Sequence, residues 1–297
     1  MAFRAPAYLR YEGERARQPA WWAIWRVTFR RGWKSTWVRR FTVGAIGMAV
    51  AITLVMYFIQ TVLPGWRTIL EDLGRLTGQE GKLVGAFDNR FYLVILQWFI
   101  YPFLLPLGAI LGYELIAGDL KSNALEAYFS RPITPWSYLL GRTGAFTAYL
   151  LLVTLAPLLW IWTFDVMTAP DGHFDKVSMV PLGMATAMTI LALTVALFIQ
   201  ALATFTRSGT ATAICLVTLV VLSGALGPIL FEITDKDSFL AIAFYQDIYT
   251  LASGFLGWPF EQDNNPPFAL SLGVISAILL GSLAILTLRI RRKGNVG

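Results

Sequence analysis

Six stretches of this chain are long and apolar enough to cross a lipid bilayer. A spanning helix needs about 20 mostly apolar residues, and the stretches that meet this requirement are 41–63, 92–117, 136–164, 181–205, 210–231 and 268–288. Only 14% of the 297 residues are charged, whereas soluble domains have about a quarter, and the mean hydropathy is +0.60. We therefore expect an all-α, polytopic membrane protein with six transmembrane helices.

The residues outside these stretches are too few for a second globular domain. We expect three parts: a cytoplasmic amino-terminal segment (1–40), a six-helix transmembrane domain (41–288) and a basic cytoplasmic tail (289–297). The first 18 residues have no apolar core, so no cleavable signal peptide is predicted.

The distribution of positive charge predicts the orientation of the spans. With both termini in the cytoplasm, 18 of the 24 Lys and Arg residues lie inside, as the positive-inside rule requires, and 13 of the 18 Asp and Glu residues lie outside. The net charge of +6 thus reflects membrane topology and does not indicate a nucleic-acid partner. The expected location is the cell inner membrane, with both termini cytoplasmic.

An aromatic face precedes the first span. Its members recur at three- or four-residue steps and are Trp22, Trp25, Phe29, Trp33 and Trp37. This pattern is typical of an amphipathic helix in the membrane interface, with cations such as Arg31 facing water or anionic lipid. Anchoring in membrane lipid is the favoured interpretation, and an elbow that braces the bundle or contacts a partner is the alternative.

Two predicted outside loops contain distinctive residues. The loop 165–180 holds Asp165, Asp171, Asp175 and the lone histidine, His173; a divalent ion could bind there, but their irregular spacing favours solvated surface. The apolar stretch 239–258 is too interrupted for a complete span, so we expect a helix or helical hairpin that dips into the outer leaflet.

The sequence lacks the motifs of the common catalytic and nucleotide sites. There is no GxSxG or HExxH, and Gly81-Lys82 is followed by Leu83, so there is no Walker A motif. With one histidine and one cysteine, no His/Cys metal cluster is expected. We therefore expect no enzyme activity, cofactor or metal in this chain itself.

The span interiors contain no charged residues, which disfavours an ion-coupled carrier. Mildly polar residues there, such as Gln60, Gln97 and Gln200, are the expected lining of any pathway. An external energy source is the simpler interpretation. GxxxG-type patterns at Gly108/Gly112 and at Gly273/Ala277/Gly281 favour packing within the monomer over a dimer face.

The polar segment 114–142 is more elaborate than a link between two spans requires. Gly118 is expected to break the second span, and Asp119 to cap a short helix that ends before Pro132. Thr134 is then expected to cap the third span, with Pro135 in its first position. A short helix held between two spans would pass a displacement to both of them.

This segment resembles the first cytoplasmic loop of ABC-2 type permeases. The similar runs are 119–126, 130–133 and 138–142, and the order of the other parts also matches: an interfacial helix, six spans and a membrane-embedded segment before the last span. The sequence departs from the usual pattern at Asn123-Ala124, where the family often has Gly-Thr, and at Arg142, where it often has Lys.

The resemblance implies that the loop forms a coupling helix that docks into a groove on an ATPase subunit. The residues implied for docking are Asp119, Lys121, Leu125, Glu126, Tyr128, Phe129, Arg131 and Pro132, and the gating or coupling candidates are Glu114, Arg142 and Arg207.

The resemblance also implies the assembly. Two ABC ATPase subunits would bind ATP and magnesium, and a second permease copy or a related permease would complete the pathway. The expected function is export of a lipid, a glycan or a hydrophobic compound. The alternative is an ATPase-driven scaffold or mechanical transmitter that moves no small molecule.

Overall fold

The computed structural model describes residues 18–62, 65, 89–121, 133–169, 172–206, 208–257 and 265–294, which contain helices and no strand. In chain order the elements are α1 (Ala20–Trp33), α2 (Thr36–Val62), α4 (Asn89–Phe99), η1 (Ile100–Leu104), α5 (Leu105–Lys121), α7 (Pro135–Thr168), α8 (His173–Val177), α9 (Val180–Thr206), α10 (Gly209–Thr234), η2 (Asp237–Ile242), α11 (Phe244–Phe255) and α12 (Phe268–Gly294).

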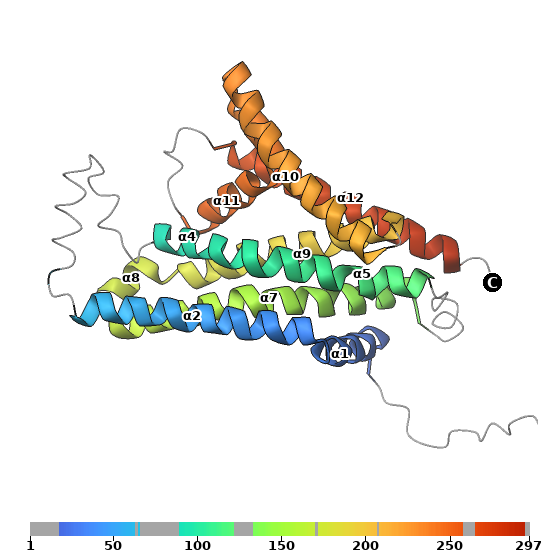
Figure 1. Cartoon of the computed structure of the whole chain (residues 1–297), viewed down its shortest axis with the longest axis horizontal. Helices are drawn as coiled ribbons and strands as arrows, with labels where there is room; N and C mark the ends of the chain where they lie inside the picture. The colour runs from blue at the N-terminus through green and yellow to red at the C-terminus, as the bar shows by residue number, and fades with distance from the viewer. Residues whose placement is uncertain are drawn as a thin grey trace, which may run out of the picture.

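Within these ranges, six helical segments are long and apolar enough to cross a membrane, as predicted. Helices α2, α5, α7 and α9 run lengthwise beside one another, while α10 and α12 run at an angle to them and α12 packs against α9 (Figure 1). Helix α1 and the carboxyl end of α12 lie at one end of the bundle, and α8 lies at the other. Both ends of the described chain therefore lie on the same side, as an even number of spans requires; the cytoplasmic identity of that side stays a prediction.

Helices α7 and α9 form the centre of the core. Their apolar windows are 56% and 61% buried, whereas that of α10 is only 11% buried. Helix α7 packs against α1, α2 and α9, and it contributes Phe146, Leu150 and Val153, which are fully buried. A displacement of α7 would therefore reach most of the bundle.

The second span contains a π-helical turn. Pro102 lies within η1, between α4 and α5. Proline removes one backbone donor and its ring crowds the carbonyl one turn back, so a helix interior accommodates it by local widening. The span predicted at 92–117 therefore continues through this turn.

Glycines allow close contact between α5 and α9. A Cβ at Gly108 would lie 2.9 Å from a methyl carbon of Ile199, and one at Gly112 only 2.2 Å from another. The predicted packing within the monomer is confirmed for this pair. It was wrong for Gly273 and Gly281 on α12, because a Cβ at either position would meet no described atom within 4 Å.

Helix α1 packs along α7 as well as presenting indoles to its surroundings. The Phe29 ring stacks on Tyr149 of α7 with centroids 4.5 Å apart, and a Cβ at Gly141 would lie 2.7 Å from Ile24. The predicted helix is present, but it ends at Trp33, so Trp37 belongs to α2 and the aromatic face is divided by a turn. These contacts support the bracing interpretation, and the position in the interface stays a prediction.

The segment before the last span is helical, as expected. A 3-10 turn, η2, precedes α11, which packs against α9, α10 and α12. Whether α11 dips into the outer leaflet is not tested by these contacts.

Candidate functional site

The segment between α5, which ends at Lys121, and α7, which begins at Pro135, is named the connector. Its end has the predicted local structure. Thr134 caps α7, because its side-chain oxygen accepts a hydrogen bond from the Ser137 amide at 3.1 Å, and Pro135 is the first helical residue. Proline is well placed there, since its missing amide proton would have no helical acceptor.

The start of the connector differs from the prediction. Helix α5 continues through Gly118 to Lys121, so Gly118 does not break the span and Asp119 is not a cap. A single glycine costs a helix only about 1 kcal/mol. The Asp119 carboxylate bonds to side chains of α7 and not to the backbone amides of a new helix.

We name Asp119, Tyr138 and Arg142 the connector clamp. Asp119 Oδ2 accepts a hydrogen bond from the Tyr138 hydroxyl at 2.7 Å and pairs with Arg142 Nη2. The Arg142 and Asp119 side chains are only 7% and 14% exposed. The guanidinium carbon lies 5.7 Å from the centre of the Tyr138 ring, which adds a cation–π contact.

The clamp joins the two ends of the connector at one point. Asp119 comes from the last turn of α5, while Tyr138 and Arg142 lie one turn apart on α7. A buried charge pair with hydrogen bonds fixes geometry strongly, because separating it leaves a desolvated charge without compensation. The ends of α5 and α7 are therefore held as one unit.

The other predicted docking and coupling residues are described only in part. Glu114 and Lys121 lie on α5, but only their backbone is described. The residues that lie outside the described part of the chain are Leu125, Glu126, Tyr128, Phe129, Arg131, Pro132 and Arg207. Their roles stay predictions.

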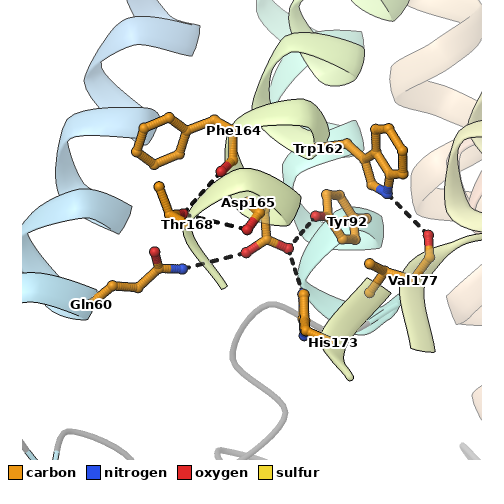
Figure 2. Close-up of polar contacts among 8 residues, drawn as sticks. All are labelled: Gln60, Tyr92, Trp162, Phe164, Asp165, Thr168, His173 and Val177. Atoms are coloured by element: carbon orange, nitrogen blue, oxygen red, sulfur yellow. Dashed lines mark hydrogen bonds and ion pairs between the residues drawn. The ribbon is translucent and has the colours of Figure 1, made fainter. Parts of the chain in front are cut away.

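A second polar cluster lies at the opposite end of the bundle and is centred on Asp165 (Figure 2). Asp165 Oδ2 accepts from the Tyr92 hydroxyl at 2.6 Å and lies 2.8 Å from His173 Nε2, and Oδ1 lies 3.4 Å from Gln60 Nε2. These four residues, which we name the Asp165 hub, come from α2, α4, α7 and α8.

The hub corrects the prediction for Asp165. Asp165 is not loop surface: α7 extends to Thr168, and Asp165 is fully buried, whereas Asp175 is exposed as expected. Gln60 donates to Asp165 and Gln200 accepts from Thr143 at 3.0 Å, so these two glutamines join helices within the bundle. Each buried carboxylate or amide needs such partners because desolvation without them is costly.

The sequence held an indirect signal for the hub. An aspartate directly after a long apolar stretch and eight residues before the only histidine is compatible with a return contact across a tight turn. Tyr92 and Gln60, which complete the hub, come from two other helices, and no local pattern relates them to Asp165.

Asp247, on α11, is another buried carboxylate, but its hydrogen bonding differs from that of Asp119 and Asp165. It is fully buried, and among the described residues neither of its oxygens has a hydrogen-bond partner. Burial raises the pKa of its carboxyl to about 7, and the polar side chain of Ser271 nearby lowers this pKa by a smaller amount.

Replacing Asp247 by asparagine is expected to stabilise the protein increasingly as the pH rises from about 4 to about 7. The folded carboxyl has a pKa of about 7 and the unfolded one about 3.9, so stability falls as pH rises between these values and is lowest above 7. Asp247→Asn should raise the melting temperature by about 5 °C at pH 8 and by much less at pH 5.

Thermal unfolding of the purified protein across this pH range measures the effect. Asp237→Asn is the matched control, because Asp237 is an exposed carboxylate just before α11. A stabilisation by Asp247→Asn that is the same at both pH values would contradict the assignment.

The described architecture defines a class of protein: a polytopic helical membrane protein with the connector clamp at one end of the bundle and the Asp165 hub at the other. The family comparison identifies the class further, because the model of the ABC-2 family transporter protein matches residues 38–288. The chain therefore belongs to the ABC-2 family and is a membrane permease of the ABC transporter type. No individual curated protein matches it.

Proposed function

We propose that the chain is the membrane subunit of an exporter that is driven by an ABC ATPase through the connector between α5 and α7. Two ATPase subunits would bind ATP and magnesium, and a second permease copy or a related permease would complete the complex. It would lie in the cell inner membrane with both termini in the cytoplasm. The ATPase must bind the connector differently in its two nucleotide states, because only differential affinity shifts a conformational equilibrium.

The connector clamp is the observation that carries this proposal. The carboxylate of Asp119 and the guanidinium of Arg142 are 23 residues apart in sequence, yet they are paired and nearly buried. A force applied to residues 122–132 would therefore reach α5 and α7 together. Since α7 packs against α1, α2 and α9, it can distribute that displacement through the core.

An apolar cavity supports a hydrophobic substrate, or a substrate with a hydrophobic part. Its volume is about 160 Å³, and it lies between α5, α9, α10, α11 and α12. Nine of its ten lining residues are apolar, including Phe198, Leu216 and Phe244, and the tenth is Ser223. A lipid or a hydrophobic compound suits this lining, because polar groups that enter it would find few hydrogen-bond partners.

Reversing the charges of Glu126 and Arg131 is expected to weaken association with the ATPase. Both residues are in the connector, and truncating one charged partner at an interface costs on the order of 2 kcal/mol or more. Glu126→Lys combined with Arg131→Glu should lower co-purification of the ATPase at least roughly tenfold. Asp175→Lys, at the opposite end of the bundle, is the control and should leave it unchanged.

Quantitative mass spectrometry of the purified complex gives the ratio of ATPase to permease. Full assembly and full transport by the doubly reversed variant would exclude docking through these residues.

A further inference from the structure

A cationic cavity lies where α1 meets the bundle, beside the connector clamp. It has a volume of about 380 Å³, and its lining residues are Thr28, Arg31, Gly32, Lys34, Ser35, Leu111 and Arg142. A buried water needs only about 10–15 Å³ of such space, so the cavity admits a much larger polar group. The lining comes from α1, the turn after it, α5 and α7.

The chemistry of the lining selects an anion. Among the described side chains that line the cavity, three are cations, two carry hydroxyls and none is a carboxylate. Arg and Lys side chains, with hydroxyl donors beside them, form the strong charge-assisted hydrogen bonds that phosphate oxygens accept. Asp119 pairs with Nη2 of Arg142, whereas Arg31 and Lys34 are exposed and are therefore the cations of the cavity that an incoming anion reaches first.

The neighbouring side chains indicate where this anion comes from. Trp33 and Trp37, on either side of the turn that holds Lys34 and Ser35, are 43% and 50% exposed. Exposed indoles beside cations are typical of the headgroup layer of a membrane. We therefore expect the cavity to lie at the depth of the lipid phosphates.

We propose that this cavity binds the phosphate headgroup of an anionic phospholipid from the leaflet on the side of α1 and the connector. The site adds to the proposed function and does not depend on ATPase docking. Because Arg142 lines the cavity and also pairs with Asp119, the cavity adjoins the clamp that holds the connector ends.

Retention of phosphatidylglycerol by the purified full-length protein tests the site. The variant Arg31→Ala/Lys34→Ala removes two lining cations, and Arg26→Ala/Arg30→Ala removes two exposed cations of the same helix that do not line the cavity. Native mass spectrometry in titrations with the lipid should show at least roughly tenfold weaker binding for the first variant, and less than about twofold for the second. Melting temperatures close to that of the wild type would show that both variants are folded.

Two further titrations identify the ligand. Phosphatidylcholine, which has no net charge, should bind at least about tenfold more weakly than phosphatidylglycerol. Inorganic phosphate at equal concentration should not displace the anionic lipid. Equal losses in the two variants, equal binding of the two lipids, or displacement by inorganic phosphate would each overturn the proposal.

Discussion

Replacing Arg142 by alanine is expected to lower ATP-driven transport by at least about tenfold, because the ends of α5 and α7 would no longer move together. The change leaves the Asp119 carboxylate, which is only 14% exposed, without its cation. Breaking a buried pair by removing one partner costs about 3–5 kcal/mol, so a fall in stability should accompany the loss of transport. Asp119→Ala is expected to have the same effect on transport.

Charge exchange distinguishes the clamp from general destabilisation. Asp119→Arg and Arg142→Asp each place like charges together and should be more harmful than alanine, whereas the double exchange restores opposite charges. A double-mutant cycle should give a coupling energy of about 1–3 kcal/mol, measured as recovery of thermal stability and of transport in reconstituted vesicles. Arg39→Ala, an exposed cation near the same end of the bundle, is the control. Strictly additive effects of the two substitutions would show that the pair does not couple the helices.

Replacing Asp165 by alanine is expected to destabilise the bundle by about 3 kcal/mol. The change leaves the Tyr92 hydroxyl, the His173 ring and the Gln60 amide without the carboxylate that all three contact. The hub connects four helices, so this loss should lower the melting temperature by roughly 6–12 °C. Tyr92→Phe, which removes one of these hydrogen bonds, should cost about 1.5–3 kcal/mol.

The matched control for the hub is Asp175→Ala. Asp175 is a carboxylate ten residues further along the same region, but it is exposed, so its substitution should change stability by no more than about 0.5 kcal/mol. Thermal unfolding of the purified variants at neutral pH makes the comparison. Equal melting temperatures for Asp165→Ala and Asp175→Ala would show that the hub does not stabilise the bundle.

The sequence predicted the features that depend on local chemistry. Span length and apolar composition predict the six membrane-crossing segments, because a bilayer sets a minimum length for each one. Thr134 and Pro135 predicted the start of α7 correctly, because capping and the missing proline amide are local properties of a helix terminus.

The sequence could not predict which distant side chains pair with each other. Asp119 directly follows a glycine, which is compatible with a helix cap, yet its partners lie 19 and 23 residues away on α7. Asp165 was expected at the surface. Its pairing with Tyr92 and Gln60 could not be predicted, because this pairing depends on the packing of four helices. Asp247 gave no signal, since its burial results from the way α11 packs against α9, α10 and α12.

Photo-crosslinking in intact cells tests the central claim most directly. A photoreactive amino acid at position 126 of the connector is predicted to give an adduct whose peptides identify an ABC ATPase with a Walker A motif. The same probe at position 175, at the opposite end of the bundle, is predicted to give none. Absence of the ATPase from the adducts at position 126, or its equal capture at both positions, would contradict the claim that energy enters through the connector.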